Sequence, residues 1–141
     1  MFFPISDVAD FHKLTGLPIL NKPTIPAADR VELRWNLVNE EVNNELKPAI
    51  DADDLVGIGD AIVDSIYVLI GMALEYGLPL PMLWQAVQNA NMSKADPVTG
   101  EIKRREDGKI LKPEGWKPPD VAGIIEHATK YGSWMAAGTR S

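Results

Sequence analysis

The chain has 141 residues, and its hydrophobic fraction of 45% is enough to bury the core of one domain. It has no cysteine and only two histidines, which excludes disulfides and thiolate metal sites and argues against a zinc site. Its net charge of −6 argues against a nucleic-acid-binding surface. The longest apolar stretch, about 14 residues from Ala61 to Leu74, is too short to span a bilayer, and residues 1–10 lack a secretory signal. We therefore expect a soluble cytoplasmic protein, located in the host cytoplasm if it is viral.

The first element in the chain is a helix predicted over residues 6–15, with Ser6 as its N-cap and apolar residues at helical spacing. Gly16 is placed to end it. Residues 16–26 contain three prolines, which favour an extended arm. His12 lies in this helix, where a packing or surface role is favoured over a catalytic one.

A long helix is predicted from about Ala27 to Lys47, ended by Pro48. Glu41 and Glu45 lie on the edge of its apolar stripe, whereas Glu40 projects away from it. The stripe has steps of three and four residues and consists of Val31, Trp35, Val38, Val42 and Leu46.

The next helix begins with the acidic residues 51–54, continues to about Tyr76 and ends at Gly77. Apolar residues surround it on most sides, so we expect it to be the central helix of a bundle or to lie at a subunit interface. Asp60 and Asp64 lie within this apolar sequence, where an unpartnered charge is costly.

The acids of these two helices form two pairs at helical spacing. At roughly 100° per residue, Glu41 and Glu45 point to similar sides of one helix, as Asp60 and Asp64 do on the other. Like charges one turn apart repel unless a cation lies between them, and oxygen-only ligands suit Mg²⁺ or Mn²⁺. We therefore predict a four-carboxylate metal site, although the glutamates alone are also typical of a solvated helix face.

A fourth helix is predicted over residues 82–94, followed by a charged segment rich in proline and glycine that resembles a flap. Short strands on either side of Asp107-Gly108 would make this flap a hairpin. A last short helix follows Asp120 as N-cap. The prediction is an all-α helical bundle that forms one domain over residues 1–141. Residues 1–25 form an N-terminal helix and arm, and residues 26–94 form a metal-binding helical core. Residues 95–141 form the flap and the C-terminal helix.

The chain resembles the MazG-like all-α nucleoside triphosphate pyrophosphohydrolases, most of all the small phage and bacterial members. The resemblance covers roughly residues 30–120 and rests on LVNEEVNNEL, GDAIVDSIYVLIGMALEYGLP, NANMSK and DPVTG…REDGKILKPEGWKPPD. It implies a homodimeric or homotetrameric helical bundle that binds Mg²⁺ or Mn²⁺. The implied activity is cleavage of an NTP or dNTP between the α and β phosphates, which gives a monophosphate and pyrophosphate.

The usual motif of that family, an EExxE helix followed by an ExxD helix, is only partly present. Glu40, Glu41 and Asp64 match it, but the other two positions fall on Asn44 and Ala61, which cannot replace a carboxylate ligand.

Two displaced acids compensate for these losses. Glu45 and Asp60 each lie one residue from the expected position, and each makes an i,i+4 pair with a retained acid. A carboxylate beside the metal could take the proton from a bound water, and the candidates are Glu40 and Glu41, although Glu40 points away from the others. The predicted metal ligands are Glu41, Glu45, Asp60 and Asp64.

Asn91 and Lys94 match the Asn and Lys that face the nucleotide in the family, which makes them the predicted substrate-binding residues. A lysine at this helix end is also explained by the helix dipole alone. Trp35, Trp84 and Trp116 are large enough to stack on a base, but core packing is the safer expectation for the first two. The basic residues of the flap either close over phosphates or form a solvated hairpin.

Two functional hypotheses remain at this point. The first is a metal-dependent pyrophosphohydrolase acting on a nucleoside triphosphate, for which a purine such as (d)GTP is one candidate. The second is a catalytically weakened helical oligomer that binds nucleotide or metal in a regulatory role. In both cases we expect neither nucleic acid nor membrane as a partner.

Overall fold

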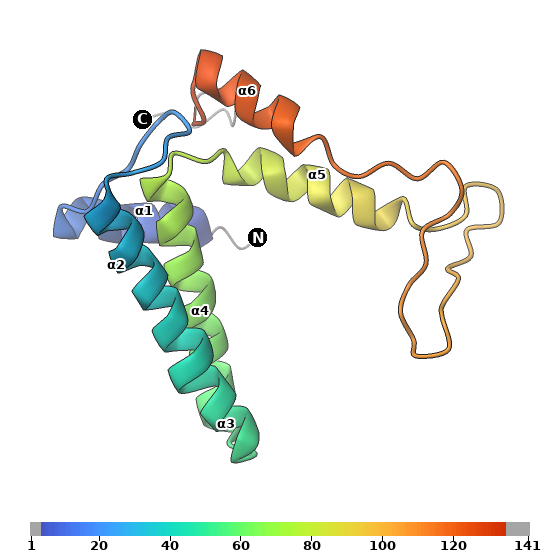
Figure 1. Ribbon diagram of the computed structural model, residues 1–141, viewed down its shortest axis with the longest axis horizontal. Coiled ribbons are helices and arrows are strands. Elements are labelled where there is room, and N and C mark those ends of the chain that lie inside the picture. Colours follow the sequence, from blue (N-terminus) through green and yellow to red (C-terminus); the bar gives the residue numbers. More distant parts are fainter. Residues whose placement is uncertain (1–3, 135–141) are drawn as a thin grey trace.

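The computed structural model describes residues 4–134, and every regular element among them is helical, which confirms the predicted all-α class (Figure 1). The two predicted strands are not formed in this part of the chain. In chain order the elements are α1 (Pro4–Thr15), α2 (Ala28–Asn39), the wide helical turn η1 (Glu40–Leu46), α3 (Lys47–Asp51), α4 (Leu55–Glu75), α5 (Leu80–Met92) and α6 (Val121–Tyr131).

One arm of the molecule consists of two long helical segments that lie side by side (Figure 1). Helices α2, η1 and α3 follow one another without a break, and each of them contacts α4. A tight turn after α3 reverses the chain, with Asp53 at a positive φ of 50°. Asp54 then caps α4, because its carboxylate accepts a hydrogen bond from the N–H of Gly57 at 3.0 Å.

The prediction that Pro48 ends the long helix is wrong, because helical structure continues through it to Asp51. A proline ring inside an α-helix clashes with the carbonyl four residues earlier, here that of Asn44. The backbone avoids this clash by widening into η1, where hydrogen bonds join residues five apart, as from Lys47 N–H to the Val42 carbonyl.

The main hydrophobic core lies where α1 crosses α4. Val8, Ile70 and Leu74 are its most buried members, with exposures of 1%, 6% and 1%. Trp134 packs against this cluster and donates a hydrogen bond from Nε1 to the Leu20 carbonyl at 2.8 Å. The core therefore joins the arm of α2 and α4 to segments at both ends of the described chain.

A second arm runs away from the first and consists of α5 and α6, which contact each other (Figure 1). Asp120 caps α6 as predicted, by accepting a hydrogen bond from the N–H of Gly123. The flap between α5 and α6 has a single antiparallel bridge, between Arg104 and Ile110. Because one bridge is not a ladder, the flap is a looped turn and not the two-stranded hairpin that the sequence predicts.

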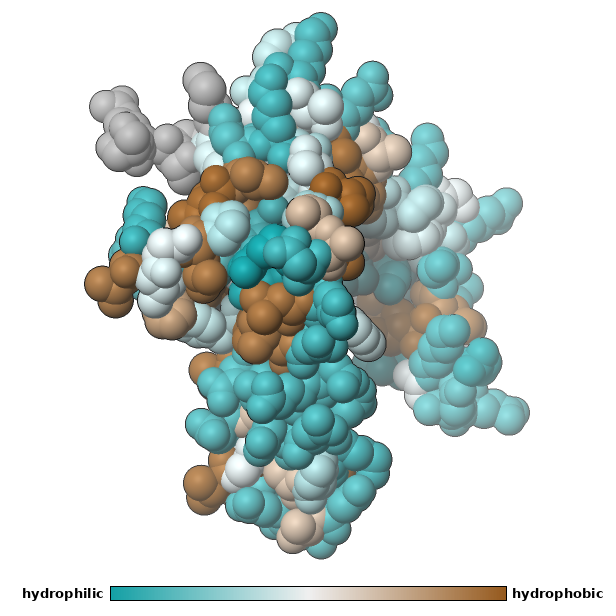
Figure 2. Space-filling model, turned by 60° about the vertical axis from the view of Figure 1, so that its left-hand side comes forward, coloured by the Kyte–Doolittle hydropathy of each residue, from teal (hydrophilic) through white to brown (hydrophobic). Residues whose placement is uncertain are grey.

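Several large apolar side chains are exposed on this open shape. Trp35 and Trp84 are 57% and 72% exposed, so their predicted place in the core is wrong within one protomer. On α4, the exposed fraction of Val63 is 62% and that of Leu69 is 47%. Figure 2 shows brown apolar patches between hydrophilic side chains on the face that it displays. Exposed apolar surface of this kind is typical of a protein–protein interface.

Helix α4 is longer than the apolar stretch seen in the sequence. Its 21 residues, with a mean hydropathy of 1.8 in the most apolar window, are long and apolar enough to cross a membrane by length and composition. The expectation that this region is too short is therefore wrong. A core helix of a soluble protein meets the same criterion, so this length does not place the protein in a membrane.

Candidate functional site

The four predicted metal ligands line one pocket between η1, α3 and α4. Its volume is about 480 Å³. Asn44 and Ala61, the two positions where the sequence departs from the family motif, also face this pocket. The acids on its wall are Glu41, Glu45, Asp54, Asp60 and Asp64. The sequence therefore identified residues that the fold brings together from two helices.

Small residues on α4 allow this pocket to form. Ala61 lies between the two aspartates and is 2% exposed, so α4 packs closely against its neighbour at this level. A Cβ atom at Gly57 would meet the Asp54 carboxylate and lie 3.2 Å from the Cβ of Ala49. Gly57 therefore permits the close approach of α3 to α4 beside the pocket, which both Gly57 and Ala49 line.

Within the part of the chain that the structure describes, the acids of the pocket repel one another and have no basic partner. Partial burial raises the pKa of Glu41, and repulsion from Asp64, Glu40, Glu45 and Asp60 raises it further. Among residues 4–134, no lysine or arginine forms an ion pair with Glu41, Glu45, Asp60 or Asp64. A bound cation would relieve this repulsion.

The carboxylates share the pocket without converging on one point. Within the described part of the chain, no three acidic or histidine side chains lie close enough to hold a metal ion as they stand. The chemistry of the group nevertheless fits a hard divalent cation, because every charged side chain that lines this open, solvent-accessible pocket is a carboxylate. Glu40 is exposed and does not line the pocket.

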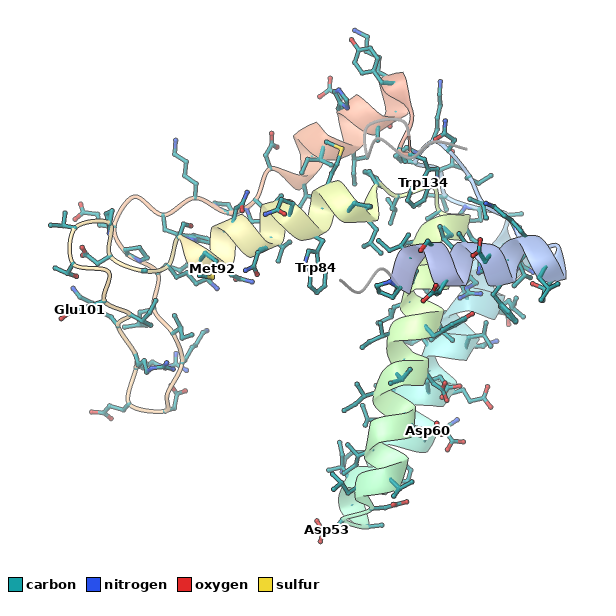
Figure 3. The ribbon with its side chains drawn as sticks, turned by 180° about the vertical axis from the view of Figure 1, so that it is seen from behind. Asp53, Asp60, Trp84, Met92, Glu101 and Trp134 are labelled. Carbon is teal, nitrogen blue, oxygen red and sulfur yellow. The ribbon has the colours of Figure 1, made fainter. Side chains whose placement is uncertain are left out.

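The two predicted substrate-binding residues lie elsewhere, at the C-terminal end of α5. Lys94 donates a hydrogen bond from Nζ to Oδ1 of Asn91 at 3.0 Å. Its ammonium also lies 5.7 Å from the centre of the Trp116 ring, and that of Lys112 lies 4.7 Å from it. Figure 3 shows Met92, which ends α5, on the arm opposite to Asp60. Within one protomer, these residues do not face the acidic pocket.

The flap is held to α5 by Trp116. Its Nε1 donates a hydrogen bond to the Ala90 carbonyl at 2.8 Å. A second pocket of about 580 Å³ lies beside this contact, between the end of α5 and the flap. Trp116 thus has a structural partner, whereas the basic residues Lys103, Arg104 and Lys109 of the flap are exposed to solvent.

Sequence reasoning missed a buried charge network at the other end of α4. Glu75 is 1% exposed, and Arg30 contacts both of its oxygens through hydrogen bonds of 2.8 and 2.9 Å. Arg34 lies 3.2 Å from the same carboxylate and donates to the Val68 carbonyl at 2.7 Å. A Cβ atom at Gly71 would collide with the Arg34 guanidinium. The available signals were an arginine at the edge of one apolar stripe and a glutamate closing the most apolar helix.

His12 lies next to this network and has the packing role that the sequence favoured. It is 2% exposed, and its Nδ1 lies 2.9 Å from the Pro18 carbonyl. This contact joins the end of α1 to the extended segment that follows it.

Comparison with known proteins gives the family. The phosphoribosyl-ATP pyrophosphohydrolase family matches residues 8–91, which is more than half of the chain. No match was found among curated proteins. A crystal structure of a "putative NTP pyrophosphohydrolase" from Exiguobacterium sp. 255-15 is 27% identical, covers 96% of this chain and 98% of its own, and has a TM-score of 0.48. Because this score indicates only partial overlap of the two structures, the assignment rests on the family match. The chain belongs to the phosphoribosyl-ATP pyrophosphohydrolase family, whose members are hydrolases of phosphoanhydride bonds.

Proposed function

We propose that this protein is a metal-dependent nucleoside triphosphate pyrophosphohydrolase that cleaves a (d)NTP between the α and β phosphates. The products are a (d)NMP and pyrophosphate. The observation that carries this proposal is one acidic pocket, in a member of a pyrophosphohydrolase family, whose four predicted ligands form no ion pair with a lysine or arginine among residues 4–134. Such a hydrolase would act on the nucleotides of the cytoplasm.

The metal would be Mg²⁺ or Mn²⁺, held by Glu41, Glu45, Asp60 and Asp64. These ions prefer carboxylate and water ligands and commonly bind phosphate oxygens at the same time. When bound, the ion would polarise the phosphorus and offset the negative charge of the polyphosphate. Without it, the pocket would repel a triphosphate.

Glu41 is the best candidate for taking the proton of the attacking water. Glu41 lines the pocket in which the water would be held, whereas Glu40 does not. The water oxygen would form a bond to the phosphorus while the bond to the pyrophosphate leaving group breaks. Glu40 precedes it in the chain and is the second candidate, although its exposed side chain would have to turn towards the pocket.

A second copy of the chain would complete the site. Asn91 and Lys94 belong to the arm that runs away from the acidic pocket, so a partner's copy of this arm is needed to bring them near a bound triphosphate. The ammonium of Lys94 would contact phosphate as a point charge. Exposed apolar residues on α4 and α5 support a homodimer or homotetramer, because they would be buried in such an interface: Ile62, Val63, Ile66, Leu69, Trp84 and Val87.

The second candidate is a nucleotide- or metal-binding oligomer with weakened catalysis. Two observations favour it: Asn44 and Ala61 replace two motif acids, and the four remaining carboxylates do not converge. The two candidates differ in turnover and not in metal binding.

The test is pyrophosphate release with Mg²⁺ or Mn²⁺ across the eight common NTPs and dNTPs, with phosphoribosyl-ATP added because the family is named for it. Release from one or a few compounds, together with the matching monophosphate and inhibition by a chelator, would establish the enzyme. A purine nucleotide such as (d)GTP is one candidate substrate. Metal binding without release from any compound would favour the second candidate.

A further inference from the structure

The wide turn η1 lies in the segment that carries the acids Glu40, Glu41 and Glu45. It follows α2 and precedes α3 with helical backbone on both sides, so it is a local widening of one continuous helix. Wide turns of this kind are rare, occur mostly as single turns inside α-helices and are frequent at functional sites. The position of η1 beside the acidic pocket therefore needs an explanation.

The widening changes which acids share a side of the helix. In a regular α-helix, residues five apart are rotated by about 140° from each other, so Glu45 would point away from Glu40. In η1 the hydrogen bonds join residues five apart, which places Glu45 one turn after Glu40 and beside Glu41. Glu45 lines the pocket together with Glu41. These two acids would lie one turn apart in a regular α-helix as well, so the wide turn changes the position of Glu45 relative to Glu40 and to α2, not its pairing with Glu41.

We propose that η1 is a one-residue insertion accommodated as a wide turn, and that the extra residue positions Glu45 as the third acid of this helix. The inference rests on the proposed function, because it concerns how that site is assembled. One of the adjacent residues Asn43 and Asn44 is the surplus residue. Removing either gives the same sequence, EEVNE, which has the spacing of the EExxE motif.

The wide turn accommodates Pro48, which lies in the first turn of α3. Its ring would clash with the Asn44 carbonyl if the helix were regular at this point. Because the Lys47 N–H bonds to the Val42 carbonyl instead, the helix passes the proline and continues into α3. The wide turn thus allows α2, before the insertion, and α3, after it, to pack against the same helix α4.

The same explanation does not apply to Asp60. Helix α4 is regular from Leu55 to Glu75, so the one-residue displacement of Asp60 is not absorbed by a wide turn. The inference is therefore confined to the helix of Glu41 and Glu45.

The test is to remove Asn44 and replace Pro48 by alanine in the same chain, which allows a regular α-helix with the EEVNE spacing. Pro48→Ala alone is the matched reference, and removal of Asn36 from the regular part of α2 is the control deletion. The measurements are Mn²⁺ affinity by electron paramagnetic resonance with Mn²⁺ alone as the probe, the unfolding temperature and pyrophosphate release.

We expect the double variant to bind Mn²⁺ within about threefold of the Pro48→Ala reference, since a spacing of four in an α-helix replaces a spacing of five in the wide turn. Glu45→Gln should weaken binding in both backgrounds. The control deletion should lose Mn²⁺ affinity, because it rotates the acids away from α4 by about 100°. Mn²⁺ affinity more than about tenfold weaker in the double variant, or failure of that variant to fold, would overturn the inference.

The outcome also separates this inference from the proposed function. If the parent protein binds Mn²⁺ and releases pyrophosphate but the double variant is folded and does neither, the register inference fails and the function stands. If the parent does neither, while the double variant unfolds at the temperature of its reference, the function fails and the one-residue insertion stands.

Discussion

Helix α4 carries acids in two regions with opposite surroundings. Glu75, near its end, is 1% exposed and contacts the two arginines Arg30 and Arg34. Asp60 and Asp64, nearer its start, are exposed to a pocket where every other charged neighbour is also an acid. The same residue class is therefore compensated by the protein in one region and left uncompensated in the other.

This difference distinguishes a charge that the fold compensates from charges for which we propose a function. A buried carboxylate persists only when its charge and lone pairs are satisfied, as they are for Glu75. In the solvent-accessible pocket, partial burial and repulsion from the neighbouring carboxylates raise the pKa of Glu41, and a group in such surroundings gains most from a ligand of opposite charge. Substitutions in the first region should therefore change stability, and substitutions in the second should change metal binding and turnover.

The largest expected effect is on turnover at the acidic pocket. We predict that Asp64→Asn lowers pyrophosphate release by at least about a thousandfold, since it removes a predicted metal ligand. The unfolding temperature should stay the same or rise, because one of the repelling charges is lost. Asp10→Asn, on the exposed side of α1, is the control and should keep full activity. Full activity of Asp64→Asn would contradict the metal assignment.

The next largest effect is on stability at the buried network. Glu75→Gln leaves Arg34 buried without its counter-ion, and breaking a buried pair in this way costs about 3–5 kcal/mol of unfolding free energy. Urea unfolding of this variant and of Glu32→Gln, an exposed glutamate of α2, measures the difference. A loss of less than about 1 kcal/mol of unfolding free energy would mean that the ion pairs of Glu75 contribute no more than exposed surface pairs do.

Much of the fold was predictable because its signals are local. Gly16 and Gly77 end helices at positive φ, and Asp120 caps α6, as the sequence indicates. The wide turn was not predictable, because Pro48 alone indicates a helix end and only the packing of η1 and α3 on α4 keeps the helix going. The arrangement of the two arms has no local signal at all.

Four of the acids that line the pocket were predictable, but Asp54 was not among the predicted ligands, the water-activating candidate Glu40 lies outside the pocket, and the pocket's shape was not foreseen. Charge in apolar sequence identified Asp60 and Asp64, and helical spacing paired Glu41 with Glu45, all of which line the pocket. Glu75 was overlooked because its two partners lie 45 and 41 residues earlier in the chain. The separation of Asn91 from the pocket depends on how α5 leaves the core, which sequence spacing does not encode.

A smaller effect should distinguish Glu45 from its neighbour Asn44. Glu45→Gln removes a predicted metal ligand and should weaken Mn²⁺ binding and turnover by more than about tenfold. Asn44→Ala should change both by less than about threefold, because an amide oxygen is a much weaker partner for the cation than a carboxylate. Both side chains are exposed, so neither change should alter the unfolding temperature by much. Equal, small effects of the two substitutions would show that Glu45 is not a ligand.

The smallest expected effect is a pH dependence of stability that belongs to the acidic pocket alone. Burial and the neighbouring acids raise the pKa of Glu41 above its ordinary value of 4.5. Between 4.5 and the raised pKa, the folded protein therefore binds more protons than the unfolded chain. This contribution to stability is fully present below pH 4.5 and is lost as the pH rises through the raised pKa.

Glu41→Gln removes that contribution, so the metal-free wild type should lose stability relative to the variant as the pH is raised from 4.5. Thermal unfolding of both proteins in a chelator, over the same pH series, measures the difference. Mn²⁺ should abolish it and stabilise the wild type at the higher pH values, because the cation neutralises the charges that raise the pKa. Parallel pH profiles of the two metal-free proteins would mean that the charge of Glu41 is already compensated, as that of Glu75 is, and the contrast between the two regions would fail at this residue.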